Sequence, residues 1–340
     1  MYNVGMANKN PKSPILEALR EATRSEEKAV AFFETHRWGD SPACPRCGGT
    51  DVYKMTVRNN PELREKNYRW RCRDCKQMHS VRTGLILEET RLPLRTWAYA
   101  FWKACASKKG VSALQISREC EISYKSALFL MHRIRFAMAE DHGSAPKLSG
   151  IVEVDEAWIG GVPRHRMRSH VDPVTGEVRR YLSRSKVERS KTPIMALVER
   201  GGRVRVRHID RVHRGTLGSA IRELVEHGSR IHTDENPSYN HLDRSTQYRH
   251  ETVNHTAKEY VRGDVTTNTV EGFFSLIKRG VYGTFHSVSK HHLHRYLAEF
   301  EFRYNTRKMD DGERTVAAIK NSEGKRLLYT GPSEGTEAQA

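Results

Sequence analysis

Three carboxylates in this chain have the types and setting that metal-dependent chemistry on a phosphodiester requires. Asp155 and Asp234 each follow an apolar, strand-like run, and Glu271 lies on the amphipathic helical segment 267–280. Phosphodiesters are anionic and repel a nucleophile, so their cleavage uses divalent cations about 3.5–4 Å apart, bound by hard oxygen ligands. The trio therefore predicts a site for two Mg²⁺ ions, with Mn²⁺ as an alternative, in which Asp155 bridges the ions and the other two acids flank them.

Each of these acids also has a simpler explanation. An acid after an apolar strand often only begins a solvated loop, and Asn268-x-x-Glu271 at a helix start resembles a capping box. The neighbouring Glu153, Glu156 and Glu235 are further candidates by residue type. The joint placement of the trio on two strands and a helix of one core favours the metal-site interpretation.

Two basic residues follow Glu271 on the same helical segment. Lys278 lies two helical turns, or about 10 Å, beyond Glu271 on the same face. We expect Lys278 and the adjacent Arg279 to bind DNA, and Lys278 to position a phosphate rather than to catalyse.

Four of the six cysteines form two Cys-x-x-Cys pairs, Cys44 with Cys47 and Cys72 with Cys75. Such pairs in a reducing compartment favour a tetrahedral Zn²⁺ site, and the longer gap between the pairs predicts a hairpin whose returning strand is NYRWRC. Two redox-active motifs are the alternative, although neither opens a βαβ unit. The sequence leaves open whether this ribbon contacts DNA or only stabilises a small segment.

The segment 92–140 has the pattern of three helices, the last two separated by a short turn at 121–123. This arrangement predicts a helix-turn-helix whose second helix enters the major groove. We expect Lys125, Arg133 and Arg135 on its DNA-facing surface. An ordinary three-helix bundle that only connects its neighbours is the alternative.

From residue 149 the pattern changes to three strands, a helix over 216–228, a fourth strand that carries Asp234, and later helices. This is the element order of an α/β fold with an RNase H-like mixed sheet flanked by helices. In that layout the first and fourth strands are neighbours, so Asp155 and Asp234 can approach each other.

The 340 residues carry a formal net charge of +17 with a pI of about 9.7, which favours a polyanionic partner. No apolar run reaches the length of a membrane span and the N-terminus lacks a signal-peptide pattern, so we expect no membrane partner and a cytoplasmic location. The expected domains are an N-terminal helical segment (1–38), a zinc ribbon (39–90), a helix-turn-helix-like DNA-binding domain (91–147), an RNase H-like DDE catalytic domain (148–310) and a C-terminal tail (311–340) with a disordered end.

The motifs VEVDEAWIGG, HTDENPSYNHL and NTVEGFFSLIKRGVYGTFHSVSKHHLHRYLAEFEFRYNTR closely resemble those of bacterial insertion-sequence transposases of the DDE (RNase H-like) class with an N-terminal zinc ribbon. The resemblance implies that Asp155, Asp234 and Glu271 bind Mg²⁺ and that Lys278 helps to hold the transposon end. It further implies hydrolytic nicking at the element's terminal repeats, then 3′-OH strand transfer into target DNA. The partners would be double-stranded DNA and further copies of the chain, at least a dimer.

Two other functions remain compatible with the sequence. The first is a catalytically inactive zinc-ribbon and helix-turn-helix DNA-binding regulator. The second is an RNase H-like nuclease without strand transfer. The intact acids favour the transposase.

Overall fold

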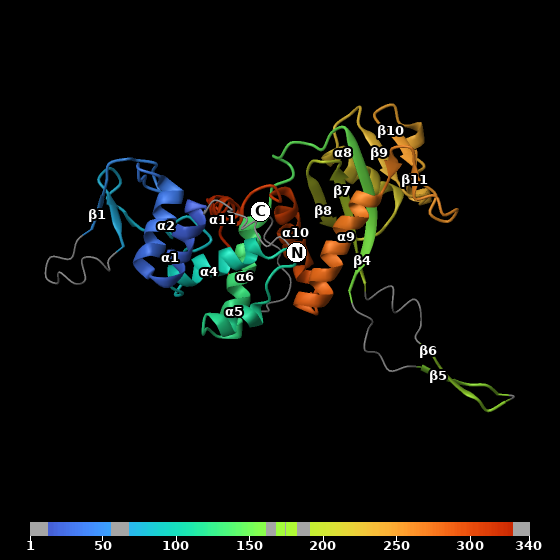
Figure 1. The fold of residues 1–340 in the computed structure, drawn as a ribbon, viewed down its shortest axis with the longest axis horizontal. Helices are drawn as coiled ribbons and strands as arrows, with labels where there is room; N and C mark the ends of the chain where they lie inside the picture. The colour runs from blue at the N-terminus through green and yellow to red at the C-terminus, as the bar shows by residue number, and fades with distance from the viewer. Residues whose placement is uncertain (1–12, 56–67, 161–167, 174, 182–190, 329–340) are drawn as a thin grey trace, which may run out of the picture. The chain divides into compact units, whose positions relative to one another are not determined.

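The computed structural model describes residues 13–55, 68–160, 168–173, 175–181 and 191–328. These residues belong to two compact units, the first made of 1–138 with 307–340 and the second of 139–306. Figure 1 shows the helices of the first unit and the sheet of the second. None of the described helices is long and apolar enough to cross a membrane.

The first unit is built on four helices that pack on one another: α1 (Pro14–Arg24), α2 (Glu26–Trp38), α4 (Leu94–Ala106) and α11 (Asp311–Lys320). A break at Ser25 separates α1 from α2, and the Ser25 hydroxyl caps α2. Asp310 and Glu313 form a capping box at the start of α11. The sequence assigns 311–340 to a C-terminal tail, but the contacts of α11 place this helix with the N-terminal helices. The predicted disordered end, 331–340, lies outside the described residues.

A small three-stranded antiparallel sheet carries the two cysteine pairs. Its order is β1 (Val52–Lys54), β2 (Trp70–Cys72), β3 (Met78–His79). The predicted returning strand thus pairs with β1, and residues 56–67 between them are not among those described. Gly48, at φ +74°, allows the tight turn in which its N–H donates to the carbonyl oxygen of Cys44.

Two further helices of this unit, α5 (Ala113–Glu119) and α6 (Tyr124–Met138), pack against each other across a four-residue turn. Glu121 adopts a left-handed backbone in that turn, at φ +54°. The Ser117 hydroxyl donates to the carbonyl oxygen of Ile122 at 2.6 Å and so holds the turn closed. The helix boundaries are those of a helix-turn-helix.

The second unit contains a five-stranded mixed sheet of order β10-β9-β4-β7-β8 (Figure 1). β4 pairs antiparallel with β7 and parallel with β9, and β10 is parallel to β9. This confirms the predicted RNase H-like layout, in which the first and fourth strands of the core are neighbours. The strands are β4 (Ile151–Ile159), β7 (Thr192–Glu199), β8 (Val204–His208), β9 (Arg230–Thr233) and β10 (Arg249–Thr252).

Helices cover both faces of this sheet, so its central strands are apolar on both sides. Val152 and Val154 of β4 pack with α8 (Arg214–Leu224), whereas Ala157 and Ile159 pack with α9 (Asn268–Gly280) and α10 (Leu293–Asn305). The remaining elements are β5 (Arg168–Val171), β6 (Val178–Tyr181), β11 (Val261–Arg262), β12 (Val265–Thr266), the 3₁₀ turns η1 (Pro237–Tyr239), η2 (Leu242–Arg244) and η4 (Lys290–His292), and the π-helical η3 (Val281–Phe285).

Candidate active site and metal centre

Asp155 lies on β4, and Asp234 directly follows the last residue of the neighbouring parallel strand β9. The register of β4 with β9 ends at Glu153 opposite His232, and continuing it by two residues would bring Asp234 opposite Asp155. Side chains alternate along a strand, so Glu153 and Asp155 share the face of β4 that α9 covers. Strand pairing therefore places the two aspartates near each other on one face.

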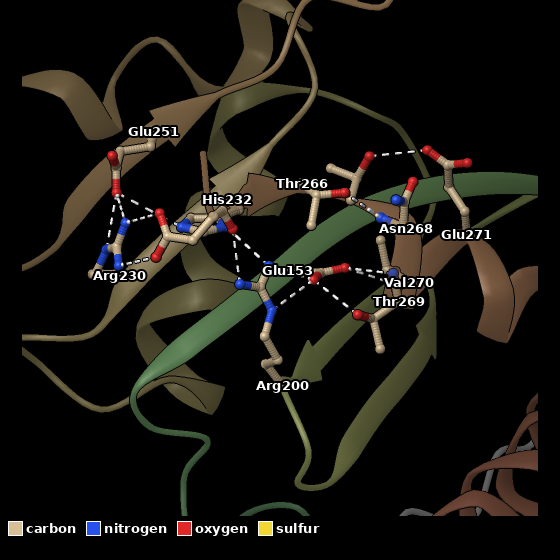
Figure 2. A network of polar contacts seen from close by, with 12 residues as sticks. Glu153, Arg200, Arg230, His232, Glu251, Thr266, Asn268, Thr269, Val270 and Glu271 are labelled. Atoms are coloured by element: carbon tan, nitrogen blue, oxygen red, sulfur yellow. Dashed lines mark hydrogen bonds and ion pairs between the residues drawn. The ribbon is translucent and has the colours of Figure 1, made fainter. Parts of the chain in front are cut away.

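Glu271 comes to this face on the first turn of α9. Val270, Phe273 and Ile277 of the same helix are buried against the sheet, so Glu271 lies beside the buried stripe and remains half-exposed. Its carboxylate accepts a hydrogen bond from the Thr267 hydroxyl at 2.9 Å (Figure 2). The capping alternative for Glu271 loses its main support, because the carboxylate of Glu153 binds the N–H groups at the start of α9.

The three carboxylates interact electrostatically. Burial, together with the negative charges of Glu156, Asp234 and Glu271, raises the pKa of Asp155 to about 7. Burial also raises the pKa of Asp234, to which the charge of Glu235 adds. A divalent cation would relieve this repulsion, so the donor set fits a cation that prefers oxygen ligands, such as Mg²⁺.

Glu156 lies on the other face of β4 and has a different environment. The Tyr239 hydroxyl of η1 donates a hydrogen bond to its carboxylate, and Tyr239 is fully buried. Burial raises the pKa of Glu156 to about 7, with a contribution from the charge of Asp234. Sequence reasoning missed the role of Tyr239, because this tyrosine lies in the HTDENPSYNHL motif but no spacing pattern connects it with Glu156.

The carboxylate of Glu235 binds the loop after β10, which leaves it less suited to act as a metal ligand. Its carboxylate accepts the backbone N–H groups of His255 and Thr256 and the Thr256 hydroxyl, and these bonds lower its pKa to about 2. The loop brings the His255 ring to 3.2 Å from the Thr267 hydroxyl and to 3.7 Å from the carboxylate of Glu271. Sequence reasoning missed His255, which no spacing pattern connects with the acids.

The four cysteines converge on one point. Cys44 Sγ lies 3.7 Å from Cys75 Sγ, Cys47 Sγ lies 3.7 Å from Cys72 Sγ, and all four sulfurs lie within 4.8 Å of one another. A tetrahedral Zn²⁺ ion with Zn–S bonds of about 2.3 Å holds its sulfurs about 3.8 Å apart. The cluster thus fits zinc. Among the described residues it is the one group of metal-ligating side chains that meets so closely.

The predicted DNA-binding residues differ in exposure. Lys278, Arg279 and Lys125 are exposed. Arg133 and Arg135, by contrast, are buried in the helical core of their unit: the Arg133 guanidinium donates to the carbonyl oxygen of Glu88 and lies over the rings of Trp97 and Phe129, and Arg135 is 0% exposed. The prediction that these two arginines face DNA is therefore corrected, since the C-terminal half of α6 is a packing surface.

These features define a class: a zinc-ribbon protein with a helical domain and an RNase H-like domain. The comparisons with known proteins agree. Residues 24–78 match the transposase zinc-ribbon domain, and residues 147–305 match the ISXO2-like transposase domain. The chain therefore belongs to the insertion-sequence transposases that join a zinc ribbon to an ISXO2-like DDE domain.

One relative is a protein of Halobacterium salinarum described as an uncharacterized protein in transposable element ISH50. It is 29% identical over 287 residues, which cover 82% of this chain and 90% of the relative. Among solved structures, the intasome of simian T-cell lymphotropic virus in complex with the PP2A regulatory subunit B56 gamma is matched over 72% of this chain and 78% of that chain. The identity is 13% and the TM-score 0.30, too low for an argument from likeness.

Proposed function

We propose that this protein is an active DNA transposase that nicks the terminal repeats of its element and transfers the freed 3′-OH to target DNA. Asp155, Asp234 and Glu271 are the proposed ligands of two Mg²⁺ ions. The observation that supports this proposal is that the charges of Asp234, which follows β9, and of Glu271, on α9, both act on the buried carboxyl group of Asp155 on β4. Bound Mg²⁺ would supply Lewis-acid stabilisation of the entering and leaving oxygens.

The chain's own residues hold and orient the DNA in this proposal. Lys278 is exposed on α9, about 10 Å along the helix from Glu271, and can bind a phosphate beside the site. Arg279 adds positive charge next to it. Strand transfer forms one phosphodiester bond as it breaks another, so the joining step needs no ATP.

DNA recognition is assigned to the first unit. In a helix-turn-helix the N-terminal residues of the second helix contact base edges. Tyr124 and Lys125, at the start of α6, are exposed, and the buried second half of the helix anchors it. Pairing two element ends requires at least a dimer of the protein on DNA.

A strand-transfer assay on labelled terminal-repeat DNA with Mg²⁺ tests the proposal. We expect joining by the wild type and a loss of at least 100-fold in Asp155→Ala and Asp234→Ala, because removal of a group that stabilises developing charge has about this cost. Glu223→Ala, on the exposed side of α8, is the matched control and should join normally. Unchanged joining in both aspartate variants would exclude the catalytic assignment, and nicking without joining in the wild type would point to the nuclease alternative.

A further inference from the structure

Glu153 is a fully buried carboxylate that is not among the proposed metal ligands. It is 0% exposed and accepts five hydrogen bonds: from Thr269 N at 2.7 Å, Thr269 Oγ1 at 2.8 Å, Val270 N at 3.2 Å, Arg200 Nη2 at 2.8 Å and Arg200 Nε at 3.2 Å (Figure 2). A buried charge is costly unless it is paired and hydrogen-bonded, and this one is both.

These bonds replace a local helix cap. The first N–H groups of a helix have no partner within it and usually bind the side chain of the preceding residue. Thr267, the residue before α9, makes no such bond with its side chain and donates its hydroxyl to Glu271 instead. Glu153, from a strand more than a hundred residues earlier in the chain, takes over the cap, and its negative charge suits the positive end of the helix dipole.

Glu153 connects the strand that carries Asp155 with the helix that carries Glu271. It lies two residues before Asp155 on the same face of β4, and the Val270 N–H that it binds belongs to the residue just before Glu271. We infer that Glu153 is a positioning residue, which fixes the start of α9 on β4 and thereby sets the placement of Glu271 relative to Asp155. This inference rests on the proposed function, because it concerns two of the proposed ligands.

A second ring of contacts supports the cap. Arg200 also donates to the carbonyl oxygen of Asp264, in the turn that leads through β12 into α9. The Asp264 carboxylate accepts from Arg230 of β9, which in turn pairs with Glu251 of β10 (Figure 2). Strands β4, β9 and β10 and the entry to α9 are thus joined through charged hydrogen bonds, which are stronger and more directional than neutral ones.

The test is a binding measurement on Glu153→Gln, which keeps the shape of the side chain and removes its charge. Binding of Mn²⁺ to the zinc-loaded, full-length protein is followed by electron paramagnetic resonance at 10 °C, with folding verified by circular dichroism. Because residues that orient metal ligands change affinity by about 10–100-fold, we expect at least 10-fold weaker binding in Glu153→Gln. Glu223→Gln, which alters an exposed ion pair with Arg207 in the same unit, is the control and should bind as the wild type does.

A double-mutant cycle separates positioning from general destabilisation. If Glu153 acts through Glu271, adding Glu153→Gln to Glu271→Ala should weaken Mn²⁺ binding by less than about 2-fold, far short of its effect alone. Should Glu153→Gln not fold, Thr269→Val, which removes the hydroxyl bond and keeps the backbone bonds, is expected to give a smaller but coupled loss.

The possible results separate the positioning role of Glu153 from the proposed metal site itself. Normal Mn²⁺ binding in a folded Glu153→Gln, or in Thr269→Val where that variant is the substitute, overturns the inference. A fully additive loss in the double mutant also overturns it. In both cases the proposed function stands as long as Asp155→Ala abolishes Mn²⁺ binding. Normal binding in Asp155→Ala would show instead that the proposed metal site is wrong.

Discussion

Replacing Asp155 with asparagine should make the metal-free second unit more stable at pH 8 while it abolishes strand transfer. Burial, together with the charges of Glu156, Asp234 and Glu271, raises the pKa of the Asp155 carboxyl to about 7. The ionised carboxylate is therefore unfavourable in the folded protein without metal. Asparagine has nearly the same shape and no charge, so the substitution removes the repulsion with little change in packing.

The magnitude follows from proton linkage. A carboxyl group with a pKa of about 4 in the unfolded chain and about 7 in the folded protein costs the folded state up to about 4 kcal/mol above pH 7. Glu156 titrates in the same range and shares the repulsion, so we expect ~2–4 kcal/mol for Asp155→Asn. Between pH 4 and 7 the folded protein binds more protons than the unfolded chain, so its free energy of unfolding falls as pH rises. The gain from Asp155→Asn is thus near zero at pH 4 and complete at pH 8.

Calorimetry of zinc-loaded protein in Mg²⁺-free buffer at pH 4.5, 6 and 8 measures this gain. The exposed Asp210, in the same unit, provides the control Asp210→Asn, which should change stability by less than about 0.5 kcal/mol at every pH. A destabilised Asp155→Asn, or a gain that does not grow with pH, would refute the electrostatic reasoning.

Three further predictions concern the rest of the chain. Reduced protein should contain about one structural zinc, and Cys72→Ser, which removes a fully buried thiol of the cluster, should lower that content and unfold the ribbon, as metal analysis and circular dichroism would show. Arg205→Ala should cost about 3–5 kcal/mol in urea unfolding, because it removes the buried arginine that pairs with the buried carboxylate of Glu301; a cost below 1 kcal/mol would contradict this. Lys278→Ala should weaken DNA binding similarly for all sequences and reduce the slope of log K against log salt by about 1 in filter binding, and an unchanged slope would remove Lys278 from the interface.

The sheet could be predicted from the sequence because local patterns specify it. Apolar runs gave the element order, and this order predicted that the first and fourth strands are adjacent, which the structure confirms. The helix over 216–228 was extended too far, since α8 ends at Leu224 where Val225 turns extended. The spacing of the two Cys-x-x-Cys pairs likewise predicted that the four cysteines meet, and the structure confirms this cluster.

The arginines could not be placed from sequence. In RVRVR the arginines alternate with valines, so the pattern indicates one apolar and one basic face of a strand, yet Arg205 is 1% exposed and paired with Glu140 and Glu301. Arg133 and Arg135, which the helix-turn-helix prediction placed on a DNA-facing surface, are buried as well. Long charged side chains can be buried where distant segments supply partners, and those partners lie too far along the chain for any local pattern to reveal.

The role of Glu153 was hidden for a related reason. By type it was one of several acids near Asp155, and its contacts with Thr269 and Val270 join segments 116 and 117 residues apart. Only the fold shows that this acid caps a helix while its neighbour two residues on faces the proposed metal site.

The central claim is that Asp155, Asp234 and Glu271 together hold divalent metal. Crystals soaked in Mn²⁺ and measured at the manganese absorption edge test it directly. The account predicts anomalous density for manganese between these three carboxylates, absent in crystals of Asp155→Ala. Density elsewhere on the second unit with none at this site, in crystals whose cysteine cluster retains zinc, would contradict it.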